Sequence, residues 1–426
     1  MNEITDKRTV LIVAYNFPPR AERYGLRTAN IARNLLDHGW KPVVLTCAPD
    51  GTCNRNEGWA AELEEAGVEI YRTKPFKRVP AQPDGSVKVP SPRVTSMKRW
   101  FAQWNRQPDI YIAWRNEALR MSEQIMRDHY INVILGVAPP FSDFTLAQEI
   151  ATNYAIPYTI DYGDIWNENP LHAYPTPAHQ RKVKAMEERL LKQAAMVFVP
   201  TRTTKEDLLR RHRFLTHEEI TIVPHGYDVR EYNTSVQPDK TNGCVLTHYA
   251  DFTNGETPKH VFTALKNLRA KREDIRNQLH IRIVGLLRER HKKLIRKWQL
   301  HDVVHHFPTT ERATAVQLCL ESDALWLCLQ HDTPAGHPVL SDYIAMRKPV
   351  LLTAPRGALH KVVTDSQAGF VSEPKDIATI TQHLEKIFDA WKSNALPKPQ
   401  EQFAEQFNCV NGVKDVSRHL GMSMRL

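Results

Sequence analysis

The sequence lacks the features of a membrane-spanning or a disulfide-rich secreted protein. Its 426 residues contain no apolar run near the ~20 residues that cross a bilayer. The six cysteines show no CxxC pair and no Cys/His spacing of a zinc site. The N-terminus places acidic residues before a short apolar run and shows no cleavable signal pattern. We therefore expect a cytoplasmic protein whose cysteines are buried thiols.

Several catalytic signatures are also absent. The sequence has no GxSxG nucleophile elbow, no GxxxxGK[ST] phosphate loop and no HExxH zinc motif. It also has no acidic pair of the DxD kind placed as in metal-dependent transferases. We therefore predict chemistry that uses neither a metal ion nor a bound cofactor.

The charge balance is basic. Lys and Arg exceed Asp and Glu to give a net charge of +9, which favours phosphorylated ligands, anionic lipid or nucleic acid without choosing among them. Residues 98–107 (KRWFAQWNRQ) interleave bases with aromatic side chains, which fits either plain packing or an anionic membrane or acceptor surface. Residues 286–298 place apolar side chains on one helical face and bases on the other. This pattern predicts a surface helix packed on its own sheet.

Short apolar runs alternate with helix-length amphipathic segments along the chain, the pattern of βαβ units on a parallel sheet. Thr28–His38 has a helical apolar stripe that ends at Gly39. Residues 75–95 are rich in Pro, Gly and Ser and predict an exposed loop. Strands are predicted at residues 10–14, 42–46, 68–72, 133–137, 157–161, 196–200 and 220–224, and again at 244–250, 280–285, 303–307, 324–329, 349–353 and 369–373.

The polar, turn-rich residues 224–243 separate the two sets of strands. We therefore predict an N-terminal Rossmann-like domain over residues 1–225, a hinge over 226–243, a second parallel-sheet domain over 244–402 and a terminal segment over 403–426. Open parallel sheets bind ligands outside the carboxyl ends of their strands. Two facing sheets would therefore bind a ligand in a cleft between the domains.

Two helix starts could bind phosphate, because helix N-termini offer N–H groups and effective positive charge. Gly25 permits close backbone approach ahead of the first helix, and His337–Ser341 lead into a later helix. Arg288 and Arg290 follow the strand that ends at Gly285, at the edge of the sheet where a ligand is expected.

Asp161 and Asp164 straddle the sequence IDYGDIW after another predicted strand. A glycine between them makes the turn tight, so both carboxylates could point into the cleft between the domains. A carboxylate there could orient, hold or deprotonate a bound hydroxyl. Turn capping is the alternative for aspartate in such a place. The residues that follow, Trp166, Asn167 and Asn169, favour a sugar site.

Six segments carry a resemblance to a known family. They are FPPRAERYGLRTANIARNLLDHGW (17–40), ILGVAPPFSDFTLAQEIATNYAIPYTIDYGDIWNENP (134–170), AAMVFVPTRTTKEDL (194–208), ITIVPHGYDVREY (220–232), GHPVLSDYIAMRKPVLLTAPRGALHKVV (336–363) and FAEQFNCVNGVKDVSRHL (403–420). Their order over nearly the whole chain resembles the family-4 glycosyltransferases, which are retaining enzymes of GT-B fold. The resemblance is greatest to the branch that makes bacterial polysaccharides and surface glycans.

This resemblance implies two Rossmann-like domains, an N-terminal acceptor-side domain and a C-terminal donor domain, with a last helix over residues 403–426 that crosses back to the first. It implies that Asp164, with Asp161 as the back-up, lies by the reacting sugar and acceptor. It also implies that Asp342 accepts hydrogen bonds from the donor ribose. The other expected donor-binding residues are Val339, Leu340, Ser341, Gly285, Arg288, Arg290, Lys259 and His225, and the expected phosphate- or acceptor-binding loop comprises Gly25, Arg20 and Arg27.

Ordinary structural roles are the alternatives for these residues. Asp342 could be a first-turn acid that favours the helix dipole, the bases could be solvated, and His225 could satisfy backbone groups. The chain also departs from the family pattern. Gly25 stands where the family has two glycines, His225 replaces the Asn of Asn-Gly, Asp342 replaces a glutamate and Pro334 its partner glutamate, and residues 251–259 retain only Lys259 as a base.

We therefore predict an enzyme that transfers a hexosyl or related sugar from a nucleotide diphosphate sugar to a glycan or lipid-linked acceptor, with retention of configuration. The nucleotide sugar is a substrate, and no cofactor or metal is expected. The enzyme would work in the cytoplasm or at the inner face of the membrane, in contact with anionic lipid. The alternatives are a DNA glycosyltransferase or nucleic-acid binder that uses the basic surface, a sugar-nucleotide epimerase of the same fold, and a non-catalytic paralogue.

Overall fold

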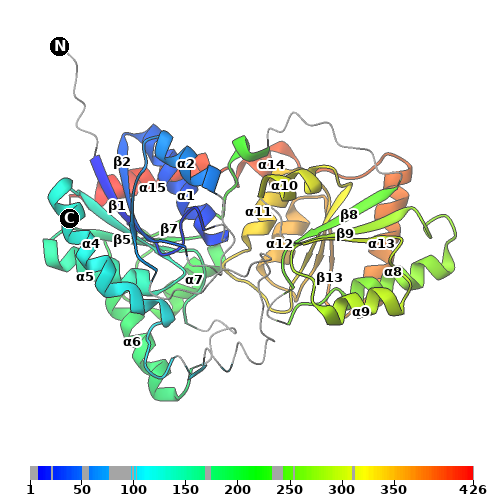
Figure 1. The fold of residues 1–426 in the computed structure, drawn as a ribbon, viewed down its shortest axis with the longest axis horizontal. Helices are drawn as coiled ribbons and strands as arrows, with labels where there is room; N and C mark the ends of the chain where they lie inside the picture. The colour runs from blue at the N-terminus through cyan, green and yellow to red at the C-terminus, as the bar shows by residue number, and fades with distance from the viewer. Residues whose placement is uncertain are drawn as a thin grey trace, which may run out of the picture. The chain divides into compact units, whose positions relative to one another are not determined.

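A computed structural model describes residues 8–20, 23–49, 57–75, 97, 100–101, 103–167, 174–232, 243–252, 255–308 and 312–425. The chain forms two compact units. The first comprises Met1–Gly226 together with Cys409–Leu426, and the second comprises Tyr227–Asn408. Each unit is built around its own parallel sheet (Figure 1).

The first unit contains a seven-stranded sheet in the order β3-β2-β1-β4-β5-β6-β7, with every neighbouring pair parallel. Each predicted apolar run of the N-terminal half forms one strand. The strands are β1 (Arg8–Val13), β2 (Trp40–Cys47), β3 (Glu69–Thr73), β4 (Val133–Ala138), β5 (Tyr158–Tyr162), β6 (Met196–Val199) and β7 (Ile220–Ile222).

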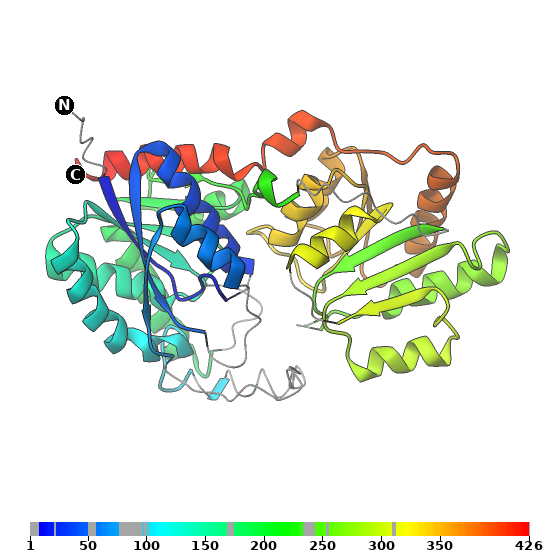
Figure 2. The same ribbon diagram turned by 45° about the horizontal axis from the view of Figure 1, so that its top comes forward.

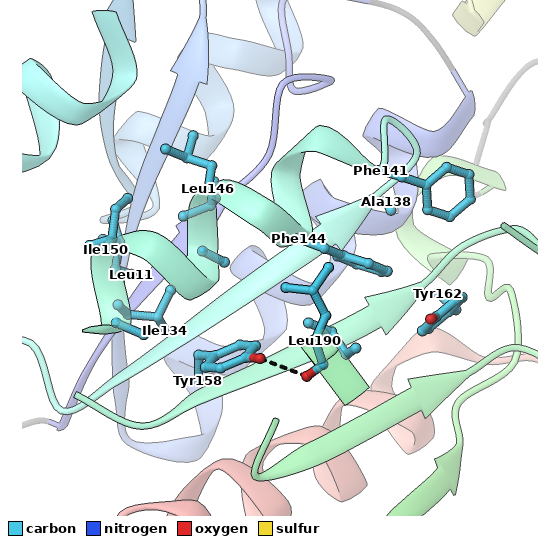
Figure 3. Close-up of a cluster of buried hydrophobic side chains, with 14 of the residues drawn as sticks. Leu11, Ile134, Ala138, Phe141, Phe144, Leu146, Ile150, Tyr158, Tyr162 and Leu190 are labelled. Carbon is cyan, nitrogen blue, oxygen red and sulfur yellow. Dashed lines mark hydrogen bonds between the residues drawn. The ribbon is translucent and has the colours of Figure 1, made fainter. Parts of the chain in front are cut away.

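Helices cover both faces of this sheet, so its central strands are apolar at successive positions. In β1, Leu11 and Val13 face one buried cluster while Val10 and Ile12 face another. Figure 3 shows the first cluster, where the Tyr158 hydroxyl donates to the carbonyl of Leu190 at 2.6 Å. The helices are α1 (Arg23–Leu35), η1 (Leu36–His38), α2 (Glu57–Glu65), η2 (Ile110–Trp114), α4 (Arg115–Asp128), α5 (Ser142–Tyr154), α6 (Pro177–Gln193), α7 (Arg202–Arg211) and α15 (Cys409–Ser423).

The second unit repeats the design with a six-stranded parallel sheet in the order β10-β9-β8-β11-β12-β13. Its strands are β8 (Cys244–Tyr249), β9 (Leu279–Val284), β10 (Val304–Phe307), β11 (Ala324–Cys328), β12 (Val350–Thr353) and β13 (Gly369–Ser372). Its helices are η3 (Val229–Tyr232), α8 (Lys259–Lys271), α9 (Glu289–Lys297), α10 (Arg312–Leu320), α11 (Pro338–Ala345), α12 (Ala358–Asp365), α13 (Ile377–Lys392) and α14 (Glu401–Glu405). The predicted fold class of two Rossmann-like parallel-sheet units is confirmed.

The last helix returns to the first unit, as predicted. Figure 2 shows α15 in red beside the first unit's blue elements. There the Trp40 indole donates to the Ser417 hydroxyl at 3.1 Å. Val413 and Leu420 of α15 are buried in the same hydrophobic cluster as the apolar side chains of α1. The terminal segment is not one helix, however. Phe403 and Phe407 pack on each other in the second unit, so the chain stays there until residue 408.

Three further predictions concern local features. Gly39 ends the first helix in the left-handed region at φ 76°, as predicted. The basic segment 286–298 forms α9, with Leu287 and Ile295 buried in the core of the second unit, so its reading as a surface helix on its own sheet is confirmed. The cysteines that the structure describes are buried thiols, namely Cys47, Cys244, Cys319, Cys328 and Cys409.

Some predictions fall partly or wholly outside the described residues. These are the exposed loop, of which only residue 75 is described, most of the hinge, and residues 98, 99 and 102 of the basic–aromatic segment. Asn169 and Cys53 also lie outside. Among the helices that the structure describes, none has the length and apolar character needed to cross a membrane.

Candidate functional site

In the first unit, the carboxyl end of β5 presents Asp164. The Gly163 amide donates to the Ala138 carbonyl at 2.7 Å, and a Cβ at Gly163 would lie only 2.6 Å from that oxygen. The position therefore requires glycine, and the chain turns sharply there. Asp164 follows, half-buried, and one of its oxygens accepts the backbone N–H of Ile165 at 2.8 Å.

The other oxygen of Asp164 accepts a hydrogen bond from the Tyr24 hydroxyl at 3.1 Å. Tyr24 lies in the first turn of α1, and its ring centroid is 6.4 Å from that of the buried His225. The structure therefore brings together Asp164, His225 and the start of α1, which the sequence placed far apart. Sequence reasoning missed Tyr24, because a single tyrosine beside Gly25 carries no distinguishing signal.

Asp161 has a different setting from the one predicted. It lies inside β5, paired with Val137 of β4, because the strand continues to Tyr162. Its carboxylate is fully buried and binds the Arg27 guanidinium through two hydrogen bonds of 2.7 Å. The prediction that Asp161 lies on a turn beside Asp164, open to an acceptor, is wrong.

Arg27 and Arg20 are both engaged inside the first unit. Besides Asp161, Arg27 donates to the carbonyls of Val223 and Pro224 at 2.9 Å each. The Arg20 guanidinium lies 4.9 Å from the centre of the Tyr15 ring, and its side chain is buried. These contacts give no support to a phosphate-binding loop made by the two arginines.

The structure does not require glycine at Gly25, because a Cβ there would make only ordinary van der Waals contacts. A Cβ there would lie 3.4 Å from the Arg20 carbonyl oxygen and 3.5 Å from that of Asn16. Trp166 and Asn167 are buried and form no open sugar site. The Trp166 ring stacks on Phe141 at 4.9 Å, and the Asn167 amide donates to the buried Glu187 of α6 at 2.6 Å.

In the second unit, Asp342 belongs to a buried charge cluster, which we define as Glu231, Tyr232, Arg312 and Asp342. Arg312 donates to both carboxylate oxygens of Asp342, at 3.0 and 3.2 Å, and also pairs with Glu231 at 2.5 Å. The Tyr232 hydroxyl donates to Asp342 at 2.5 Å. Burial and the nearby charge of Asp342 raise the pKa of Tyr232 well above its usual range, so the phenol stays protonated.

The charge cluster ties η3 to the start of α10 and to the middle of α11, and sequence reasoning missed the three members other than Asp342. Both oxygens of Asp342 already have partners within the unit, so a ribose would have to share or replace them. At the start of α11, the side chains of Val339, Leu340 and Ser341 are buried, which leaves only their backbone groups for a ligand. The Leu340 amide already donates to the His337 carbonyl at 2.9 Å.

Basic side chains gather at the carboxyl end of β9. Gly285 has φ +129°, and a Cβ there would lie 2.8 Å from an oxygen of Asp251, so the bend after the strand needs glycine. Arg288 precedes α9, and Arg290 lies in its first turn. Partial burial, followed by the charge of Arg290, lowers the pKa of Arg288, so a nearby anion would stabilise this pair of cations.

The buried His291 side chain forms a hydrogen bond with Arg290. The Arg290 Nε–H donates to His291 Nε2 at 3.0 Å, which requires that nitrogen to be unprotonated. Burial, with the charges of Arg290 and Arg288, lowers the pKa of His291 to about 4, so the ring is neutral near pH 7.

Lys259 is exposed at the start of α8, after the loop that follows β8. Over the described part of the chain, no group of three or more His, Cys, Asp or Glu side chains could hold a metal ion.

The fold and these strand-end groups define a class of two-unit parallel-sheet α/β proteins with polar and basic groups at the carboxyl edges. Two family models match the chain. The glycosyl transferase 4-like domain matches residues 24–226, and the glycosyl transferases group 1 model matches residues 233–406. The chain therefore belongs to the family-4-like glycosyltransferases of GT-B fold, which transfer sugars from nucleotide-sugar donors.

Solved structures share the fold over nearly the full length. HepE from Anabaena, in complex with UDP-glucose, is 14% identical with a TM-score of 0.64, covering 97% of this chain and 99% of its own. Sucrose-phosphate synthase from Thermosynechococcus elongatus is 11% identical with a TM-score of 0.65, covering 96% and 98%. UDP-GlcNAc 2-epimerase from Neisseria meningitidis, bound to UDP-GlcNAc, is 13% identical with a TM-score of 0.59, covering 97% and 100%. No curated protein matches the sequence.

Proposed function

We propose that this protein transfers a hexosyl or related sugar from a nucleotide diphosphate sugar to a hydroxyl of a glycan or lipid-linked acceptor. Configuration at the sugar is retained, and the reaction takes place in the cytoplasm at the inner face of the membrane. The observation that carries the proposal is Asp164, held by Tyr24 at a strand end of the first unit, in a chain whose two halves both match glycosyltransferase models.

The second unit is proposed to bind the donor. A nucleotide diphosphate leaves with additional negative charge, and fixed cations lower the energy of that leaving group. Arg288 and Arg290 supply two positive charges beside the bend at Gly285. Lys259 and the backbone at the start of α11 are the further candidates for contact with the donor, and Asp342 remains the proposed partner of the ribose.

The first unit is proposed to position the acceptor. A half-buried carboxylate such as Asp164 can accept a hydrogen bond from the hydroxyl of the sugar acceptor and so orient that hydroxyl. The Tyr24 hydroxyl fixes one oxygen of that carboxylate, and the ring of His225 packs near Tyr24. The acceptor would meet an ordered group rather than a freely rotating one, which favours a productive geometry.

Donor binding gives the direct test of the proposal. In a thermal-shift screen of nucleotide diphosphates and their sugars, beginning with UDP-glucose, one ligand at about 100 times its dissociation constant should stabilise the protein by roughly 2.7 kcal/mol. Replacing Arg288 and Arg290 together with Ala should weaken that ligand about 10- to 100-fold, since charge-assisted contacts contribute roughly 1.5–3 kcal/mol.

The matched control replaces Lys293 and Lys297 with Ala, because both are exposed bases of the same helix beyond its first turn. Its donor affinity should equal that of the unaltered protein. Equal losses in the two double variants would mean that the basic surface acts only through its overall charge.

Metal independence is a separate expectation. The two arginines offer the positive charge that a divalent cation supplies in other transferases, so transfer should continue at its full rate in excess EDTA. The measurement compares initial rates with chelator and with added manganese or magnesium. Loss of transfer in chelator, restored by either metal, would contradict the expectation.

An epimerase is the second candidate, because a UDP-GlcNAc 2-epimerase shares the fold over the whole chain. An epimerase would interconvert the sugar of the nucleotide sugar without an acceptor, whereas a transferase releases nucleotide diphosphate only as acceptor is consumed. Product analysis with and without acceptor separates the two. A nucleic-acid binder or DNA glycosyltransferase would instead show DNA affinity that falls steeply with salt, and a non-catalytic paralogue would bind donor without turnover.

A further inference from the structure

An exposed aromatic patch lies on the first unit, and none of its residues is among the groups assigned above. We define the patch as Met97, Trp100, Phe101 and Trp104. Met97, Phe101 and Trp104 are 56%, 61% and 46% exposed, which is unusual for side chains of this size close together in the chain. The Trp100 ring contacts both Phe101, at 5.0 Å, and Trp104, at 5.8 Å, so the three rings form one continuous cluster.

Bases from two parts of the chain lie close to the patch in sequence or on the helix that it contacts. The Trp104 ring packs edge-on against His179 in the first turn of α6, at 5.1 Å. Exposed Arg181 and Lys182 follow on the same helix, and exposed Arg106 lies two residues after Trp104. No acidic residue occurs in the sequence between residues 85 and 108, or between 169 and 186.

We propose that this patch and the adjoining start of α6 dock the protein on an anionic phospholipid bilayer. An exposed apolar cluster beside a helix start that carries bases and no acids fits the boundary between acyl chains and anionic headgroups. A nucleic acid fits less well, because single strands need separate ring faces on which bases stack. Here the rings meet edge to face, at interplanar angles of 87° and 79°.

This inference rests on the proposed function in one respect, since a lipid-linked acceptor gives the docking its purpose. Its physical basis is independent of catalysis. Each exposed base near an anionic membrane adds about tenfold or less to partitioning, and salt screens that contribution. The apolar side chains add a contribution that salt does not remove.

The test is co-sedimentation of the full chain with vesicles of phosphatidylcholine alone and of phosphatidylcholine mixed with phosphatidylglycerol. We expect binding to the mixed vesicles only. The Arg181→Ala/Lys182→Ala variant should partition roughly 10- to 30-fold less onto them. The Met97→Ser/Phe101→Ser variant should lose at least about tenfold, in high salt as well as low.

Two matched variants control for general effects. Lys293→Ala/Lys297→Ala removes the same charge from α9, and Tyr130→Ser removes an aromatic side chain that is 84% exposed elsewhere on the first unit. Both should bind vesicles like the unaltered protein. Absence of vesicle binding, or equal binding by patch and control variants, would overturn the assignment. So would patch variants that lose affinity for a DNA or RNA oligonucleotide while keeping full vesicle binding.

Catalytic readouts separate this proposal from the proposed function. Patch variants should keep the donor-induced thermal shift and the rate of transfer to a soluble acceptor. Vesicle binding without any donor binding or transfer would count against the glycosyltransferase reaction and leave the docking surface standing. Full transfer activity in a protein that does not bind anionic vesicles would overturn the docking surface and leave the proposed glycosyltransferase reaction standing.

Discussion

Replacement of Asp164 by Asn is expected to lower the rate of sugar transfer about 10²–10⁴-fold, the usual contribution of a positioned acid or base. The substitution keeps the size of the side chain and an acceptor for the Ile165 amide, but it removes the negative charge. Donor affinity should hardly change, because the proposed donor ligands belong to the other unit. The measurement is the initial rate at saturating donor, taken together with the melting temperature of the variant.

Two variants test whether the loss comes from the Asp164 carboxylate itself. Tyr24→Phe removes only the hydroxyl that orients it, and should cost roughly tenfold or less in rate, about the worth of one hydrogen bond. Asp161→Asn should act mainly on stability, because that carboxylate is buried against Arg27. A fully active Asp164→Asn enzyme would show that Asp164 only caps the turn after β5.

The fold could be predicted because its signal is local. Most buried parallel strands are short apolar runs, and helices such as α1 and α9 show a 3.6-residue period, so both can be recognised within a dozen residues. The position of Asp164 followed from the same logic, since ligands gather where parallel strands end. Arg288 and Arg290 were located in this way from the end of β9.

The partners of the buried polar groups could not be predicted, because they are distant in sequence. Asp161 meets Arg27 across 134 residues, Asn167 meets Glu187 across 20, and Asp342 meets Arg312 across 30. Nothing in the local pattern of IDYGDIW distinguishes a carboxylate open to an acceptor from one that neutralises a buried guanidinium. The same residue types serve both purposes, and only the position of Arg27 on α1, beside Asp161, decides between them.

The pair formed by Arg27 and Asp161 also leads to the second large prediction. Arg27→Ala would leave the Asp161 carboxylate buried without its counter-charge, and breaking a buried ion pair from one side costs about 3–5 kcal/mol. For a unit of this size such a loss corresponds to a fall in Tm on the order of 10 °C. Calorimetry of the full chain, with the transition of the first unit followed, provides the measurement.

Replacing both partners separates the buried charge from the packing. In Arg27→Met/Asp161→Leu no unpaired charge is left at this buried position, so much of the lost stability should return. Recovery should be incomplete, because the carbonyls of Val223 and Pro224 also lose the donor that Arg27 provides. The Arg27→Ala variant should bind donor nucleotide normally below its melting temperature. An unchanged Tm combined with weakened donor binding would contradict this, and would return Arg27 to the phosphate-binding role that its position near Gly25 first indicated.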